Sequence, residues 1–335
     1  MILQQKKLLI FLKFNNFHLR DIITAHRTVE DIRKRVFVIN ERENSRILTF
    51  YDFIIFKMSV LLKGSAKVVG FTPEKNVRIR MHKNTPLASR EATIELPKDR
   101  VIFRTVLRYG TWEIEESEFL AKAIKEISSK SNKVALVDIG ANSGLVSLQT
   151  SNLSGTNHDI VLFEPLSKHT KAIKHNLSNL NNKFFINEFG LGLEDGIAEF
   201  YTQGSNFGNS SLLKTLVPSK NLIKNEIVIK ETAQVTESLL NQYESIVLKC
   251  DIQGMDSVVL ARISENIWEK IVAGVIEVHA HEQIDIRDIE ILLKKLTRYN
   301  FLAWDSQFTD TITLKDLRDF WLAKNNSEKN LFFKL

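Results

Sequence analysis

Cysteine occurs only once in this 335-residue chain, at Cys250. A single thiol excludes an intrachain disulfide and any metal site that needs several thiolates. Because a reducing compartment is the simplest setting for such a chain, we expect a cytoplasmic protein. Side chains alternate along a strand, so Cys250 should face away from its neighbours Lys249 and Asp251. We therefore expect a buried thiol with no nucleophilic role.

Long hydrophobic runs are also missing. The apolar run at the N-terminus is short and no small-residue cleavage site follows it, so the sequence predicts no secretory signal. The apolar stretch at residues 47–62 carries Asp52 and Lys57 and is too short to cross a bilayer. We expect no transmembrane segment. Peripheral membrane contact by this stretch stays open, although packing against its own domain is the more common outcome.

A strong excess of one charge is absent as well. The formal net charge is +6, with 26% charged residues, which is not the footprint of a dedicated nucleic-acid binder. Basic residues outnumber acidic ones within the first 46 residues, and only this feature favours a nucleic-acid substrate. Since such charge is more often a solvated helical face, we expect no nucleic-acid partner.

Residues 1–110 have the pattern of an N-terminal α+β extension. Apolar residues at helical spacing predict one or two helices in the first 46 residues, including residues 29–38. Short alternating segments then predict strands at 66–71, 77–81 and 93–97. We interpret the N-terminal helices as an accessory cap rather than a docking arm.

Residues 111–335 alternate between helical and strand patterns. After a helix at 113–127, the predicted strands lie at 133–139, 159–164, 184–189, 227–232, 245–251 and 271–278. The predicted helices begin at 145 and cover 167–180, 256–263 and 284–296, with a short one near Ser238. Closing strands are expected at 301–304, 311–314 and 320–323. This order predicts an α/β, Rossmann-like domain, a mostly parallel sheet with helices on both faces.

The turn after the first strand of this domain is glycine-rich. Asp138 lies at the strand end, and Gly140, Asn142 and Gly144 follow, so asparagine replaces the middle glycine of a dinucleotide fingerprint. The turn offers backbone N–H groups but no lysine or arginine for phosphates. The methionine end of S-adenosylmethionine suits it better, its carboxylate meeting the N–H groups and its amine meeting an acid such as Asp138.

Glu164 ends the second strand of the domain. A carboxylate in this place can accept two hydrogen bonds from a ribose diol. The alternative is an acid that caps the helix beginning near Ser167. The order strand, turn, helix, strand, acid favours the ribose role. Asp251 and Glu277 also fall at strand ends, and ligands of such sheets bind at that edge.

Five segments resemble the FkbM family of S-adenosylmethionine-dependent methyltransferases. They read VDIGANSG from residue 137, FEP from 163, GNSSL from 208, LKCDIQGMD from 248 and IEVH from 276. The resemblance covers about residues 105–305. It implies a class I methyltransferase fold, whose seven-stranded sheet has an antiparallel last strand. It also implies methyl transfer to oxygen, often a sugar hydroxyl on a polysaccharide, glycolipid or secondary metabolite, so a small-molecule or glycan acceptor is expected.

The resemblance also marks a departure and a candidate lid. These proteins frequently have Glu where this chain has Gln253, and an amide cannot take up a proton, so a base role at that position is in doubt. The first four residues of the GNSSL segment lie in the polar stretch 204–211, which we interpret as a loop that closes over cofactor or acceptor. Its candidate contact residues are Asn209, Ser210 and Ser211. A plain flexible connection is the alternative.

Methylation of a hydroxyl requires a base, because the sulfonium already supplies an activated methyl group. Asp251 is the first candidate and His279 the second. Lys249 shares a strand face with Asp251 and should pair with it, as Glu277 should with His279. A structural ion-pair network is almost as good an interpretation of these four residues. A divalent metal held by Asp251, Glu277 and a neighbour stays open by ligand type, but no compact metal motif occurs and we expect none.

Two other classes of function compete with this prediction. A nucleotide-dependent oxidoreductase uses a related sheet, but the interrupted glycine pattern argues against it. A non-catalytic module that binds the cofactor without turnover is kept open by Gln253.

Overall fold

The computed structural model describes residues 66–72, 76–83, 85–89, 91–97, 101–203, 206–217, 222–281, 283 and 285–335. All of them belong to one compact unit, Ser59–Leu335. The predicted helices of the first 46 residues and the apolar stretch 47–62 lie outside the described residues. The domain boundary at residue 110 stays a prediction. No helix within the described ranges has both the length and the apolar character needed to span a membrane.

The three predicted N-terminal strands are confirmed. They are β1 (Ala66–Phe71), β2 (Val77–Met81) and β3 (Ala92–Leu96), which form an antiparallel sheet in that order. A short helix, α4 (Ile102–Tyr109), follows. The Asn176 side chain attaches β3 to the larger part of the fold, since it accepts a hydrogen bond from Glu95 N (2.7 Å) and donates to Glu95 O (2.8 Å).

The main sheet confirms the predicted class I methyltransferase fold. Its strand order is β13-β14-β12-β11-β4-β5-β6. The parallel strands are β4 (Val134–Ile139), β5 (Asp159–Phe163), β6 (Phe184–Asn187), β11 (Ser245–Cys250) and β12 (Ile271–Ala280). The last strand, β14 (Ser327–Lys334), is antiparallel to its neighbours β12 and β13 (Phe301–Ala303). Every residue of β4 and β11 is buried, because these central strands are covered on both faces.

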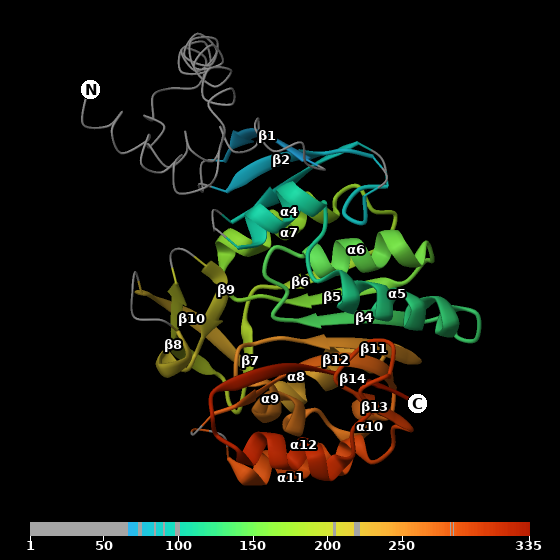
Figure 1. Ribbon diagram of the computed structural model, residues 1–335, viewed down its shortest axis with the longest axis vertical. Helices are drawn as coiled ribbons and strands as arrows, with labels where there is room; N and C mark the ends of the chain where they lie inside the picture. Colours follow the sequence, from blue (N-terminus) through green and yellow to red (C-terminus); the bar gives the residue numbers. More distant parts are fainter. Residues whose placement is uncertain are drawn as a thin grey trace. The chain divides into compact units, whose positions relative to one another are not determined.

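Helices cover both faces of this sheet, as predicted (Figure 1). On one face lie α5 (Ile114–Ser128), α6 (Leu145–Ser154) and α7 (Ser167–Leu177). On the other face lie α8 (Thr232–Leu240), α9 (Asp256–Arg262), α10 (Glu265–Trp268), α11 (Ile286–Leu296) and α12 (Leu314–Leu322). The amphipathic helix α11 turns an apolar stripe inward, because Ile289, Leu292 and Leu296 are all buried.

A second, four-stranded sheet stands between β6 and β11 in the chain. Its order is β7-β10-β8-β9, with β7 (Gly190–Gly192), β8 (Gly196–Gln203), β9 (Asn206–Ser211) and β10 (Leu222–Glu231). The prediction of a loop at 204–211 is therefore wrong for residues 206–211. Apart from Phe207, these residues have little strand preference, but the segment pairs antiparallel with β8.

The end of the chain also differs from the prediction. Residues 320–323 were expected to form a strand, but most of them lie in α12. This helix begins with a capping box between Thr313 and Asp316, and Leu317 and Trp321 are buried at a spacing of four residues. At 311–314, only an isolated bridge from Thr311 to Ala303 replaces the predicted strand.

Candidate active site

An open pocket lies at the carboxyl ends of β4, β5 and β11 and encloses about 970 Å³, part of it open to solvent. The second sheet contributes one wall through Leu191, Phe200 and Ile229. Seven of the residues singled out from the sequence line it: Gly140, Asn142, Glu164, Ser210, Lys249, Asp251 and Gln253. Asp138, Gly144, Ser211, Glu277 and His279 are not among its lining residues. The side chain of Asn209 lies outside what the structure describes.

The glycine-rich turn is held by backbone geometry that few residues can adopt. Gly140, Asn142 and Gly144 all have positive φ, of 83°, 50° and 73°. Asparagine tolerates this left-handed region better than most side chains, so Asn142 can replace the middle glycine. Most N–H groups of the turn are already bonded; those of Gly140 and Ala141 donate to Phe163 O. The first-turn N–H groups of α6 are therefore the donors left for an anion.

We predict that Gly140→Ala disrupts this turn. A Cβ at Gly140 would lie 1.9 Å from the backbone oxygen of Asp251 and 2.9 Å from Ile252 Cγ2, so the two strand ends must separate. The left-handed φ alone costs roughly 1–2 kcal/mol for a residue with a Cβ. Thermal unfolding should show that Gly140→Ala loses more stability than this. At Gly155, φ is also positive but nothing lies within 4 Å of an added Cβ, so Gly155→Ala should lose only the stability that the left-handed φ costs. Equal losses in the two variants would contradict the close approach.

Glu164 has the helix-capping role considered for it, and its ribose role stays a prediction. Its Oε1 accepts a hydrogen bond from Leu166 N (2.9 Å), the residue before α7, and its Oε2 accepts one from Asn142 N (2.9 Å). His169 Nδ1 lies 3.3 Å from Oε1. The carboxylate thus joins the glycine-rich turn to the start of α7. Because a carboxylate has about four acceptor positions, it can still accept hydrogen bonds from a ligand in the pocket.

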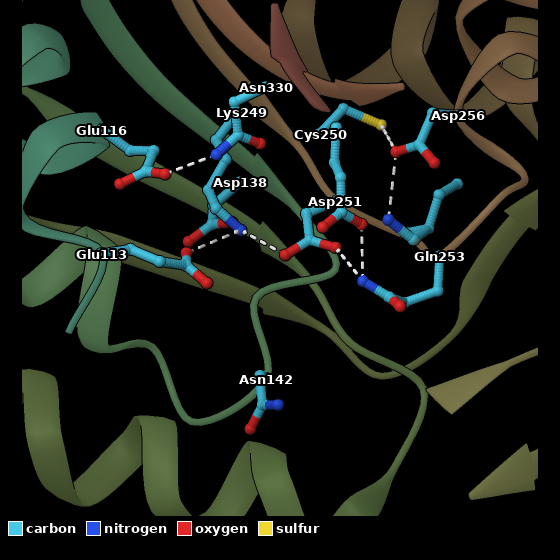
Figure 2. Close-up of polar contacts among 12 residues, drawn as sticks. Glu113, Glu116, Asp138, Asn142, Lys249, Cys250, Asp251, Gln253, Asp256 and Asn330 are labelled. Atoms are coloured by element: carbon cyan, nitrogen blue, oxygen red, sulfur yellow. Dashed lines mark hydrogen bonds and ion pairs between the residues drawn. The ribbon is translucent and has the colours of Figure 1, made fainter. Parts of the chain in front are cut away.

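Lys249 lies between two carboxylates at the pocket floor (Figure 2). Its Nζ is 3.2 Å from Asp251 Oδ2 and 3.8 Å from Glu113 Oε2, so the predicted pairing with Asp251 is present. Burial acts to lower the pKa of Lys249, but the charges of Asp251, Glu113 and Asp138 outweigh it and raise that pKa well above its usual value. Lys249 is therefore a fixed positive charge.

The two carboxyl groups beside Lys249 differ in their proton affinity. Burial acts to raise the pKa of Asp251, but Lys249 and hydrogen bonds from Glu277, Gln253 and Lys249 lower it below its ordinary value. Burial raises the pKa of Glu113 to about 8, against the opposing charge of Lys249 and with the added repulsion of Asp251. Asp251 is therefore the more acidic of these two carboxyl groups, and Glu113 is the more basic one.

Glu113 is the site residue that the sequence did not reveal. It is half-buried, directly precedes α5 and has a φ of 44°, which is unusual for a bulky residue. The buried side chain of Gln149 fixes the preceding segment, because its Oε1 accepts from Trp112 N (2.9 Å) and its Nε2 donates to Trp112 O. The only sequence signal was an acid at a helix start, which is too common to indicate a site.

Gln253 connects the pocket to the next strand. Its Nε2 donates to Asp251 Oδ1 (3.0 Å) and to Glu277 Oε2, so one amide bridges two carboxyl groups. Burial, followed by the charge of Asp251, raises the pKa of Glu277 well above its usual value, so Glu277 holds a proton. An amide donor thus contacts both of the acids that were considered as ligands of one metal ion. Ser211 supports this turn, as its Oγ donates to Gln253 O (2.6 Å).

Two predicted residues lie behind the pocket wall. Asp138 is 1% exposed and accepts a hydrogen bond from Ser147 Oγ (2.6 Å), so it supports the turn from below. His279 is 6% exposed, and its Nε2 lies 3.5 Å from Glu277 Oε2, as their shared strand face predicted.

Cys250 is fully buried and donates to Asp256 Oδ1 (3.3 Å), and burial raises its pKa well above the usual value. The expected burial of this thiol is confirmed.

Comparison with known proteins supports the motif-based resemblance. Residues 138–303 match the model of the methyltransferase FkbM domain. No curated protein matches the chain.

Several solved methyltransferases are similar at low identity. An S-adenosyl-L-methionine-bound fibrillarin from Aeropyrum pernix is 10% identical with a TM-score of 0.34, over 80% of this chain and 94% of its own. An S-adenosylmethionine-dependent methyltransferase from Agrobacterium tumefaciens is 10% identical with a TM-score of 0.32, over 82% and 77%. Precorrin-6y C5,15-methyltransferase from Geobacter metallireducens is 13% identical with a TM-score of 0.28, over 63% and 87%. Because these scores are low, the fold assignment rests on the strand order.

Proposed function

We propose that this chain, which carries a methyltransferase FkbM domain at residues 138–303, transfers a methyl group from S-adenosylmethionine to a sugar hydroxyl. The observation that carries the proposal is that one pocket contains both a carboxylate placed to bind a ribose and a group that can accept a proton. Glu164 lines one part of the pocket, and Glu113 faces Asp251 and Lys249 in another. The buried Cys250 suits a reducing compartment, and cytoplasmic localisation belongs to the proposal.

The lining residues fit S-adenosylmethionine. Glu164 keeps acceptor positions for ribose hydroxyls, and the first turn of α6 offers N–H groups to a carboxylate. Apolar side chains, including Phe163, Leu166 and Leu191, offer a surface for a purine. No lysine or arginine other than Lys249 lines the pocket within the described residues, so it is poorly suited to a pyrophosphate.

The chain's own groups can perform the remaining chemistry. When bound, S-adenosylmethionine supplies the activated methyl group. Asp251, kept ionised by Lys249, orients the acceptor by accepting a hydrogen bond from a neighbouring hydroxyl of the sugar, so that the reacting hydroxyl can donate to Glu113. Glu113 then takes up the hydroxyl proton, since its pKa of about 8 is close to working pH. His279 does not line the pocket, so we assign no proton transfer to it.

Calorimetric titration tests the cofactor assignment. We expect one S-adenosylmethionine or S-adenosylhomocysteine molecule per chain and no heat from NAD. Binding of NAD without binding of either sulfur compound would overturn the methyltransferase proposal in favour of an oxidoreductase.

Glu164→Gln should weaken binding of S-adenosylmethionine by about 10- to 100-fold, because hydrogen bonds to a charged acceptor contribute about 1.5–3 kcal/mol. The amide also presents an N–H₂ group to Asn142 N or Leu166 N, so one of these backbone donors loses its acceptor. Glu194→Gln, at an exposed acid, is the control and should bind like the wild type. Unchanged affinity in Glu164→Gln would remove the ribose role and leave only helix capping.

Mass spectrometry of glycans and lipids from cells with and without the gene tests the acceptor class. We expect one sugar-containing species to gain a single methyl group. A methylated product without a sugar would overturn the acceptor assignment, and cofactor binding without any methylated product would support a non-catalytic module.

A further inference from the structure

A second cluster of chemically competent side chains lies behind the pocket, where β12 meets β14. Glu277 and His279 are two residues apart in β12 and therefore share a face. Glu328 of β14 lies directly across from His279 in the antiparallel register. One ligand-type atom from each of the three residues lies within 4.8 Å of the other two.

The distances within this cluster match the spacing of ligand atoms around a tetrahedral metal ion. His279 Nε2 lies 3.5 Å from Glu277 Oε2 and 3.3 Å from Glu328 Oε2. A charge-assisted hydrogen bond between nitrogen and oxygen is about 2.7–2.9 Å long. By contrast, a tetrahedral ion with bonds of about 2.1 Å separates its ligand atoms by roughly 3.4 Å. Both observed separations agree with this distance between ligand atoms.

The surroundings of His279 are also those of a metal ligand. Its side chain is 6% exposed, and its second nitrogen, Nδ1, is buried without a hydrogen-bond partner. Asp256 Oδ2 lies 4.0 Å from that nitrogen, and the N–H groups of Ile252 and Gly254 hold Asp256 in place. A carboxylate near the non-coordinating nitrogen is the usual outer partner of a metal-bound histidine.

Carboxyl groups surround the imidazole of His279 on both of its nitrogen sides. Three carboxyl groups, those of Asp256, Glu277 and Glu328, lie within 4.0 Å of the ring nitrogens. Within the part of the chain that the structure describes, no lysine or arginine pairs with any of the three. Without an ion, the proton on Glu277 reduces the negative charge of this cluster, and a divalent ion would replace that proton.

We propose that Glu277, His279 and Glu328 bind a divalent transition-metal ion of the Zn²⁺ type. One imidazole and two carboxylates make a three-ligand set that leaves a fourth position for water. The side chain of Glu328 is 65% exposed, which gives the ion a route from solvent. The site is separate from the pocket, and Gln253 connects the two because it donates to Glu277.

The experiment uses the full chain after treatment with a chelator, titrated with Zn²⁺ in a calorimeter and with Co²⁺ in a spectrophotometer. We expect one ion per chain and visible Co²⁺ bands of the intensity typical of four-coordinate sites. Glu328→Gln should weaken binding by at least 10- to 100-fold, the loss typical even of outer-shell partners. Because Glu328 is exposed, this variant should fold normally, and Glu269→Gln, at another exposed acid, should bind like the wild type.

Two results would overturn the site. One is the absence of stoichiometric binding of either ion. The other is equal affinity in wild type, Glu328→Gln and His279→Ala, with near-ultraviolet circular dichroism showing that all three are folded. Neither result bears on S-adenosylmethionine binding in the pocket, so the two proposals fail independently.

Discussion

Replacing Glu113 with glutamine is expected to lower kcat for methyl transfer by about 100- to 10,000-fold, the usual contribution of a positioned general base. Glutamine keeps the size of the side chain and its hydrogen bonding but cannot accept a proton. Because Asp251 is held ionised by Lys249 and has a lowered pKa, it is too weak a base to replace Glu113. Binding of S-adenosylmethionine should change little, so the loss appears in kcat.

The pH dependence of the wild type follows from the raised pKa of Glu113. The base form of this carboxyl appears as pH rises through about 8, so kcat/KM should increase up to that pH and then level off. A bound sulfonium adds positive charge, which lowers the pKa, so the rise in kcat should occur at lower pH than the rise in kcat/KM. Glu113→Gln should lack both rises.

Two measurements check this assignment without knowledge of the acceptor. In ¹³C-labelled protein, one glutamate carboxyl resonance should titrate near pH 8 and be absent from Glu113→Gln. The native state holds this proton between about pH 4.5 and 8, where the unfolded chain has lost it, so the wild type loses stability across that range. The variant should lose less stability over the same range, because the contribution of Glu113 is missing while other buried carboxyl groups with raised pKa values remain. Glu118→Gln, at an exposed acid of α5, is the control. A normal titration of Glu113 near pH 4.5 would contradict the assignment.

The parts of the site that the sequence predicted are those that follow one another along the chain. The turn from Gly140 to Gly144 and the carboxylate Glu164 belong to one strand-turn-helix-strand unit, and the parallel sheet brings its ends together. Alternation along β11 likewise predicted that Lys249 and Asp251 share a face and that Cys250 is buried on the other. Short-range periodicity is sufficient for such relations.

The parts that were missed depend on contacts across long stretches of chain. Glu113 enters the pocket because Gln149, 37 residues away from Trp112, holds the preceding segment by two hydrogen bonds. Residues 206–211 form a strand only because β8 is available as a partner. His279 lies near the end of β12 but does not reach the pocket. Gln253 lines the pocket and donates to Glu277, and His279 lies on the other side of Glu277. None of these relations leaves a repeating pattern in the sequence.

The largest expected effect on stability comes from Lys249→Met. Methionine fills much of the volume of lysine but removes the charge beside Asp251 and Glu113. Breaking a buried ion pair by removing one partner costs about 3–5 kcal/mol, because the remaining charge stays buried without compensation. Lys249 is nearly buried, with 7% of its side chain exposed, so the full effect applies. Lys174→Met, at an exposed pair with Glu188, should cost about 1 kcal/mol or less.

The pH dependence of this loss distinguishes an electrostatic cause from a packing defect. In the wild type, the lowered pKa of Asp251 stabilises the fold at every pH above about 4, the ordinary pKa of an aspartate. This contribution is lost only in stronger acid. Without Lys249, burial acts unopposed and the pKa values of Asp251 and Glu113 rise further. Carboxyl groups with raised pKa values are tolerated when protonated and penalised when ionised. Urea unfolding should therefore show a small loss at about pH 5 and a large one at about pH 8, whereas a packing defect would cost the same at both.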